Sequence, residues 1–556
     1  MVTRTTRLGV LAALTLALML GAATSAGAQG RWMPSKMLTG KAAVEPRVAI
    51  TGSGEGIAAW GVRGPDVTIP GDAVSASIRP PGGQFGDARV ISPKDAIFVD
   101  MAANDAGAAA IGYNADGKLN VRMRPAFGDI VDPVGFQHYW GQIVVDGAGN
   151  VTVLMRENER RDTETEISKH VGYHLWTVTH FADGRVGAPQ RVATAHTIDS
   201  EDIATDAAGN LTVAWRETSA DGVPRVVKVA TGSPEGGFGE PRTLQGPRYE
   251  QGDVRVAASP AGDVLVAWGS EPDYDGSRSS YEPFPQVVPH SSFRPAGGDF
   301  GPAEKVEGVP QQLRGMYRWD LAIDRSGNAA VAWSNAHGGG VAYRPRTGAW
   351  DHEPLGGFSH EPTVAFDGKG TATAAFVEAG SGSSKERRVL AVRRARGESG
   401  FGPPAELARG KHFFGLDSAA DPLGNTIVVW SHQERWGSSS EQTERGIGSS
   451  IWDAKAPSVT DFGLDPNGEG LPAPEFDFGL NEAATVAVTV EKLGRRAVRL
   501  GRLKGRSARG TGAVDVSPAL AKKLRAKASY RATIVARDSS GRSSKPRRLT
   551  FRRLAG

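Results

Sequence analysis

Short apolar runs with polar residues at alternate positions recur along this chain, and a turn separates each pair of runs. In the stretch DIATDAAGNLTVAW (residues 202–215), Val213 and Trp215 share one face of the second run. This period of two predicts β-strands rather than helix. Asp206 and Gly209 stand between the runs, where an aspartate can cap the backbone and glycine accepts a left-handed conformation. The stretch is therefore predicted to be a β-hairpin.

The same hairpin motif occurs eight times in the sequence, each time with the same internal spacing. The turn glycines are Gly54, Gly107, Gly149, Gly209, Gly262, Gly327, Gly370 and Gly424. Six residues after each glycine stands a large side chain, in order Trp60, Tyr113, Met155, Trp215, Trp268, Trp333, Phe376 and Trp430. The mean spacing of about 53 residues is close to the roughly 40 to 50 residues of WD40 and kelch repeats, which form β-propeller blades.

A further signature predicts a fourth strand in each repeat and a closed ring. An aromatic residue and usually glycine precede this strand, as in Phe238-Gly239. The eighth repeat reaches Pro457 without such a strand, whereas residues 32–38 carry its spacing with no repeat before them. We expect the N-terminal strand to complete the last blade and close an eight-bladed propeller, since closure protects sheet edges. The alternatives are seven blades, two smaller propellers or an open solenoid.

The N-terminal segment predicts export. Arg4 and Arg7 precede an apolar run from Leu8 to Leu20, and an A-x-A site ends at Ala28, which is typical of a secretory signal peptide over residues 1–28. No later segment is apolar for the roughly 20 residues that span a bilayer. We expect a secreted, extracellular protein, retained at the cell envelope, if at all, without a covalent anchor. With no cysteine, it must be stabilised by its core instead of disulfides.

Charge divides the remaining chain into two domains. Residues 457–556 hold 20 lysines and arginines against 9 aspartates and glutamates, a net charge of +11. Residues 29–456 hold 43 against 52, a net charge of −9. We therefore expect a propeller over 29–456 and a separate basic domain over 457–556.

Two resemblances follow from these motifs. The segment from Tyr530 to Asp538 and Gly541, ahead of Leu549-Thr-Phe551, resembles the last hairpin of the immunoglobulin-like or fibronectin type III-like domains of secreted bacterial proteins. It implies a β-sandwich, for which about 100 residues suffice. The D-x-x-G-N-x-x-V-x-W repeats resemble secreted actinobacterial repeat-propeller proteins, a family that supplies no catalytic residues to carry over.

A ring of polar residues begins the predicted innermost strands, seven residues before each turn glycine. These ring positions are Arg47, Asp100, Gln142, Asp202, Arg255, Asp320, Thr363 and Asp417. They are expected near one mouth of the central channel. They could bind a ligand there, or they could join neighbouring blades through ion pairs.

The segments just ahead of these strands are rich in groups that hold ligands. The candidates are His138, Tyr139 and Trp140; His196, Asp199 and Glu201; Arg248, Tyr249 and Glu250; Tyr317, Arg318 and Trp319; His360 and Glu361; His412 and Phe413. Aromatics mixed with charged groups suit a sugar or a polar peptide, through stacking and hydrogen bonds. A polysaccharide, a cell-wall polymer or a protein is the expected partner.

No catalytic signature accompanies these candidates. A glycosidase needs two carboxylates a few ångströms apart, which Glu201, Asp202, Asp320 and Asp417 could supply. The aspartate-box spacing of sialidases and the tryptophan-docking spacing of quinoproteins are both absent. We expect a non-catalytic binding protein, with a glycan-active hydrolase or lyase as the alternative.

Cofactor and metal signals are equally weak. Asp273, Asp275 and Glu282 look like a fragment of a calcium loop without its third ligand position, and His170 and His174 stand beside a charged insertion. No cofactor and no metal site is expected. The arginines and lysines of residues 495–527 could bind anionic wall polymers or lipids, or could pair with the acidic propeller. Nucleic acid is not expected, because stacking aromatics are not interleaved.

Overall fold

The computed structural model is almost entirely β-structure. It describes residues 30–40, 43–62, 73–124, 134–136, 141–161, 169–218, 225–248, 253–270, 288–306, 316–335, 338–355, 359–379, 386–433, 445–454, 457–464, 475–481, 484–507, 510–525, 527–538 and 542–552. The predicted signal peptide and the fragment of a calcium loop lie outside these residues. No helix in the described part of the chain is long and apolar enough to cross a membrane.

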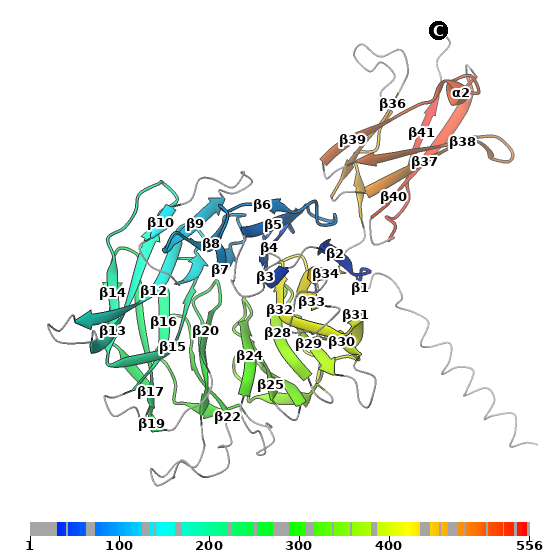
Figure 1. The fold of residues 1–556 in the computed structure, drawn as a ribbon. Helices are drawn as coiled ribbons and strands as arrows, with labels where there is room; N and C mark the ends of the chain where they lie inside the picture. Colours follow the sequence, from blue (N-terminus) through cyan, green and yellow to red (C-terminus); the bar gives the residue numbers. More distant parts are fainter. Residues whose placement is uncertain are drawn as a thin grey trace, which may run out of the picture. The chain divides into compact units, whose positions relative to one another are not determined.

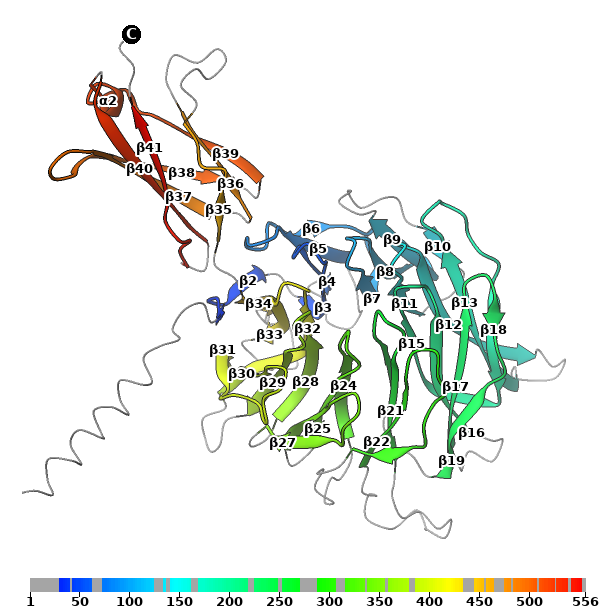
Figure 2. The same ribbon diagram turned by 180° about the vertical axis from the view of Figure 1, so that it is seen from behind.

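The described residues of the repeat region form eight antiparallel sheets, here called blades 1 to 8 in chain order (Figures 1 and 2). Blade 1 consists of β3 (Ala43–Ile50), β4 (Gly56–Val62), β5 (Ala73–Arg79) and β6 (Arg89–Val90), and blade 2 of β7 (Ile97–Ala103), β8 (Ala109–Ala115), β9 (Lys118–Arg124) and β10 (Val134–Phe136). Blade 3 consists of β11 (Gly141–Val145), β12 (Val151–Arg161), β13 (Lys169–His180) and β14 (Gln190–Ala195). Blade 4 consists of β15 (Thr197–Thr205), β16 (Leu211–Thr218), β17 (Arg225–Ser233), β18 (Gly237–Phe238) and β19 (Arg242–Arg248).

Blades 5 to 8 repeat the arrangement. Blade 5 consists of β20 (Val254–Ala258), β21 (Val264–Ser270), β22 (Val288–Arg294) and β23 (Glu304–Lys305), and blade 6 of β24 (Met316–Ile323), β25 (Ala329–Asn335), β26 (Gly338–Arg344) and β27 (Asp351–Pro354). Blade 7 consists of β28 (Ser359–Phe366), β29 (Ala372–Ala379), β30 (Arg387–Arg394) and β31 (Ala405–Gly410). Blade 8 consists of β32 (His412–Ala420), β33 (Thr426–Gln433) and β34 (Arg445–Asp453), with β1 (Arg31–Trp32) and β2 (Lys36–Thr39) from the N-terminus.

The N-terminal strands complete blade 8, as the sequence predicts. β2 pairs antiparallel with β34, and the Met33 amide donates to the Ile451 carbonyl at 2.7 Å. Each innermost strand contacts that of the next blade, and β32 contacts β3. The ring is thus closed by strands from both ends of the repeat region. The prediction of an all-β propeller closed by an N-terminal strand is confirmed.

The hairpin register is also as predicted. All eight turn glycines have positive φ angles, between 78° and 102°. The aspartate of the quoted hairpin caps its turn, because Asp206 Oδ1 accepts hydrogen bonds from the Ala208 and Asn210 amides at 2.9 Å. The eight large side chains after the glycines are all buried. They lie in hydrophobic clusters that each combine residues of adjacent blades, so that the core of this ring lies between blades.

Residues 452–556 belong to a second compact unit, and residues 32–451 to the first. The second unit contains the sheets β35-β36-β39 and β38-β37-β40-β41 and one short helix. Their bounds are β35 (Val459–Thr460), β36 (Glu475–Leu480), β37 (Ala484–Lys492), β38 (Val498–Ser507), β39 (Gly510–Asp515), α2 (Pro518–Ala521), β40 (Ser529–Arg537) and β41 (Arg547–Arg552).

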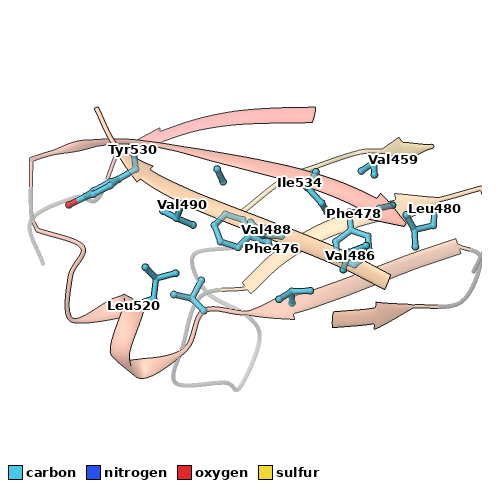
Figure 3. Close-up of a cluster of buried hydrophobic side chains, with 14 of the residues drawn as sticks. Val459, Phe476, Phe478, Leu480, Val486, Val488, Val490, Leu520, Tyr530 and Ile534 are labelled. Carbon is cyan, nitrogen blue, oxygen red and sulfur yellow. The ribbon is translucent and has the colours of Figure 1, made fainter. Parts of the chain in front are cut away.

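The two sheets share one core and form the predicted β-sandwich (Figure 3). Phe476 and Phe478 of one sheet pack with Val488 and Ile534 of the other. Tyr530, at the start of β40, accepts a hydrogen bond from the Arg525 amide at 2.5 Å and donates to its carbonyl at 3.1 Å. A tyrosine bonded in this way to the chain just upstream is typical of immunoglobulin-like sandwiches. It supports the immunoglobulin-like resemblance, which stays a proposal.

Candidate functional site

The eight ring positions all lie on innermost strands, toward the end opposite the hairpin turns. Four of them are aspartates, and these occur in every second blade: Asp100 in blade 2, Asp202 in blade 4, Asp320 in blade 6 and Asp417 in blade 8. Each is partly enclosed by its neighbours. The propeller therefore has an alternation of blade pairs that the single-blade repeat does not display.

Each ring aspartate binds the backbone of the following blade. The amides of Ile143, Val256, Val364 and Val48 donate to the Oδ2 atoms of Asp100, Asp202, Asp320 and Asp417, respectively, at 2.8–2.9 Å. Each donor is the residue directly after a ring position. Blades 2 and 3, 4 and 5, 6 and 7, and 8 and 1 are thus joined by the same contact. Of the two interpretations of the ring, this contact supports the joining of blades.

Enclosure also changes the acidity of these carboxyls. Burial raises the pKa of Asp202 and of Asp417 to about 6, against the opposing effects of Arg255 and Arg47. Burial likewise raises the pKa of Asp100. These side chains consequently become neutral at a higher pH than exposed aspartates do.

The other four ring positions interact with neighbours as well. Gln142 donates to the Glu201 carbonyl at 2.8 Å, and the Thr363 hydroxyl lies 2.8 Å from that of Ser418. Arg47 lies 3.9 Å from the Asp417 carboxylate, with its side chain 48% exposed. Arg255 lies 3.8 Å from the Asp253 carboxylate, with its side chain 36% exposed. Both ring arginines therefore combine a pairing role with access to solvent.

A pocket of about 710 Å³ lies beside these ring residues, over blades 6, 7, 8, 1 and 2. Its polar lining contains Arg47, Arg318, Arg387, Glu45, Glu361, His360, His412 and Gln433, and its aromatic lining contains Phe98, Phe413 and Phe414. Phe98 and Phe413 are buried, whereas Phe414 is partly exposed. Phe414 is thus the aromatic side chain on which a ligand in this pocket could stack.

Two glutamates give the pocket its local shape. Glu45 and Glu361 each precede a proline and have φ angles of 52° and 51°. This left-handed conformation is unfavourable for such residues, so the surrounding contacts must impose it. The Glu361 carboxylate forms an ion pair with Arg318 at 3.0 Å and accepts a hydrogen bond from the Gly415 amide at 3.1 Å. The carboxylate is therefore engaged on both oxygens and positions Arg318.

The pocket also holds cationic and neutral donors that remain available. Arg387 forms no ion pair with any residue the structure describes. Burial, followed by the nearby Arg387, lowers the pKa of His360, which favours the neutral form of its imidazole. Sequence reasoning missed Arg387 and Phe414. Arg387 comes from β30, the third strand of its blade, and no pattern near the ring positions indicates it.

A second, smaller pocket of about 200 Å³ lies over blades 3, 4 and 5. It is lined by Gln142, Arg156, Asp199, Ser200, Glu201, Asp253, Val254 and Arg255. Glu201 forms an ion pair with Arg156 at 3.0 Å, and burial raises its pKa. Asp199 binds Arg216 and Arg225 at 2.6 and 2.9 Å. The carboxylates of this pocket are therefore largely neutralised by arginines.

The structure brings together only part of the predicted set. Arg318, His360, Glu361, His412 and Phe413 line the large pocket, and Asp199 and Glu201 line the small one. His196 lines neither of these pockets. His138, Tyr139, Trp140, Tyr249 and Glu250 lie outside the described residues, as do the side chains of Tyr317, Arg248 and His170.

Trp319 corrects the prediction of a stacking residue. Its side chain is only 6% exposed, within the hydrophobic cluster between blades 5 and 6. The large apolar indole is better buried between sheets than exposed at a mouth, so it is not available to a ligand. Among the residues described, no three histidine or acidic side chains are grouped so that they could hold a metal ion.

Comparisons with known proteins show a similarity of fold alone. No family model and no curated protein matches the chain. Similar solved structures include a PL25 ulvan lyase, with a TM-score of 0.39, 8% identity and coverage of 61% of this chain and 89% of that chain. The β-propeller domain of the Trilobed protease from Pyrococcus furiosus has a TM-score of 0.36 and 11% identity, covering 65% and 96%. The α-L-arabinanase from Penicillium chrysogenum has a TM-score of 0.35 and 10% identity, covering 66% and 98%.

Proposed function

We propose that this chain is a secreted, non-catalytic binding protein whose ligand occupies the large pocket over blades 6, 7, 8, 1 and 2. The observation that carries the proposal is that the ring residues and the pocket residues at this mouth of the channel have different roles. The ring aspartates bind the backbone amides of neighbouring blades, whereas the adjoining pocket presents unused donors and a partly exposed aromatic ring.

The lining indicates the chemistry of the ligand. Arg47 and Arg387 offer forked donors that suit a carboxylate, and Phe414 offers a face for a sugar ring or an apolar side chain. Glu45 is exposed, and its carboxylate can accept hydrogen bonds from hydroxyl groups. A saccharide or peptide bearing a carboxylate fits this combination best.

A thermal-shift screen of the chain without residues 1–28 tests the proposal. The probes are glucuronate- and galacturonate-containing oligosaccharides, neutral cello-oligosaccharides, an acidic tetrapeptide and cell-wall fragments. At a hundred times its dissociation constant, a ligand stabilises the folded state by about 2.7 kcal/mol. An acidic probe should raise the melting temperature, and Arg387→Ala and Phe414→Ala should abolish the rise.

Arg185→Ala is the matched control, because Arg185 is an exposed arginine of blade 3 outside both pockets. It should leave the shift intact. The proposal fails if no probe shifts the melting temperature, or if the shift survives both pocket substitutions.

A glycan-active hydrolase or lyase is the second candidate, favoured by the raised pKa values of Glu201 and Asp202. A raised pKa favours the protonated form, in which a carboxyl can serve as a general acid. However, Glu201 binds Arg156 of blade 3, whereas Asp202 binds the Val256 amide of blade 5. These two carboxyls face opposite neighbouring blades, which does not suit attack on one glycosidic bond. Release of new sugar ends from a glycan, lost in Asp202→Asn, would establish the enzyme.

A further inference from the structure

The outer face of the sheet β38-β37-β40-β41 carries a concentration of positive charge. Val486, Val488 and Val490 of β37 point into the sandwich core. Because successive side chains of a strand alternate between faces, Thr485, Ala487 and Thr489 lie on the opposite, outer face. The strand register then identifies every residue that shares this face with them.

The register places cations on both sides of the small central residues. Thr485 pairs with Arg506 of β38 and Arg537 of β40. Thr489 pairs with Arg502 and, through Thr533, lies in line with Arg548 of β41.

Further cations extend the same face. They are Lys504 beside Ala487, Arg499 beside Glu491, Arg531 opposite Glu491, and Arg552 beside Ser529. Eight cationic side chains therefore share one face, and seven of them are exposed, Arg531 being half-buried.

Carboxylates are scarce on this cationic face. Glu491 is the one carboxylate on the described part of this face, and it binds Arg531 at 2.8 Å. Arg502, Lys504 and Arg506 form no ion pair with any described residue. Like charges held so close repel one another, and an anionic partner relieves that repulsion.

The spacing of the cations favours a linear partner. Arg502, Lys504 and Arg506 stand at every second residue of β38, which places them about 6.8 Å apart along a straight line. The central residues between the two cationic edges are Thr485, Ala487, Thr489, Thr533 and Val535, so this part of the face is flat and uncharged. A chain with an anionic group on each repeat unit can follow such an edge.

Other polyanionic partners fit less well. The outer face as described carries no aromatic side chain on which a nucleobase could stack. It also carries no large apolar side chain that could enter a bilayer. We propose that this face of the sandwich binds a linear anionic polymer, other than a nucleic acid, that carries a phosphate, sulfate or uronate group on each repeat unit. This surface is separate from the pocket of the propeller.

Binding of the chain without residues 1–28 to fluorescent long-chain inorganic polyphosphate tests the inference. The affinity is measured over a series of salt concentrations, because the slope of log K against log salt reports the number of charge contacts. The triple variant Arg502→Gln, Lys504→Gln, Arg506→Gln should lose at least tenfold in affinity, and the magnitude of its slope should fall by roughly two to three.

The matched control removes the same charge elsewhere in the sandwich. Lys522→Gln, Arg525→Gln, Lys527→Gln replaces three exposed cations that follow α2 and should lose less than threefold. Equal losses in the two triple variants would overturn the inference, since attraction would then follow net charge alone. Stronger binding to phosphatidylglycerol vesicles or to duplex DNA than to polyphosphate, or no binding at all, would also overturn it. Unchanged melting temperatures would show that both variants fold.

Discussion

The backbone amide of Val48 donates a hydrogen bond to Asp417 Oδ2 over 2.8 Å, although 369 residues separate the two in the sequence. Val48 belongs to the first blade and Asp417 to the last. The contact therefore acts at the seam of the ring, together with the pairing of β2 and β34. Because three further aspartates make the same contact between other blades, the seam resembles the rest of the ring.

Asp417→Ala should destabilise the propeller by about 1–3 kcal/mol. The substitution leaves the enclosed Val48 amide without its acceptor, and an unsatisfied enclosed donor costs about that much. Urea unfolding followed by tryptophan fluorescence measures the change. Asp417→Asn is the control, because its side-chain oxygen can still accept the bond. Equal destabilisation by Asn and Ala would contradict this role of the acceptor atom.

Stability should fall as the pH rises from about 4 to above 6 through the contributions of Asp202 and Asp417. Burial raises both pKa values to about 6 in the folded protein, from ordinary values near 3.8. The folded state thus holds these protons more tightly than the unfolded state, and ionisation at higher pH disfavours folding. At about 1.4 kcal/mol per pKa unit, each carboxyl accounts for up to about 3 kcal/mol.

The difference between the wild-type protein and Asp202→Asn isolates this effect from all other titrations. Asparagine stays neutral, so the variant should gain stability relative to the wild-type protein as the pH rises from 4 to 7. Melting temperatures in a pH series measure the gain. A constant difference across this range would show that Asp202 titrates in the folded state as it does in the unfolded state.

The tryptophans of the repeat depend on glycines of the neighbouring strand. Gly340 of β26 pairs directly with Trp333 of β25, and a Cβ atom at position 340 would overlap the indole ring. Gly340→Ala should therefore cost about 1–3 kcal/mol, since a tightly packed core must shift to accept it. Gly246→Ala, where nothing lies within 4 Å of the added atom, should cost less than 1 kcal/mol. Similar losses at both sites in urea unfolding would contradict the steric explanation.

The hairpins and the ring closure were predictable because their causes are local. Gly209 needs a left-handed backbone in its turn, and Trp215 needs burial, whatever the neighbouring blades do. The strand that completes blade 8 is indicated by the spacing of residues 32–38, together with the absence of a fourth-strand signature before Pro457 in the eighth repeat. Each of these signals is contained in a few consecutive residues.

The pocket was only partly predictable because it depends on how the blades are placed side by side. The sequence predicts Asp202 at a mouth of the channel, but its hydrogen bond with the Val256 amide depends on the position of the next blade. Arg387 comes from a third strand, far along the chain from the innermost strand of its own blade. Trp319 follows two polar or aromatic candidates in the sequence, and only the packing of blades 5 and 6 shows that it is buried.

The turn-side end of the channel is spanned by an ion pair between Asp105 and Arg325. Asp105 lies in the hairpin turn of blade 2 and Arg325 in that of blade 6, with three blades between them on either side. Both side chains are about half exposed, so solvent screens their attraction.

We expect a double-mutant cycle of Asp105→Ala and Arg325→Ala to give a coupling energy of about 0.2–1 kcal/mol, which should vanish in 1 M salt. Chemical denaturation of the two single variants and the double variant supplies the cycle, with Arg185→Ala and Asp183→Ala as an exposed pair within one turn for comparison. A coupling above 2 kcal/mol that persists in salt would contradict solvent screening. It would indicate that the pair shields this end of the channel from water, leaving the opposite mouth as the way in.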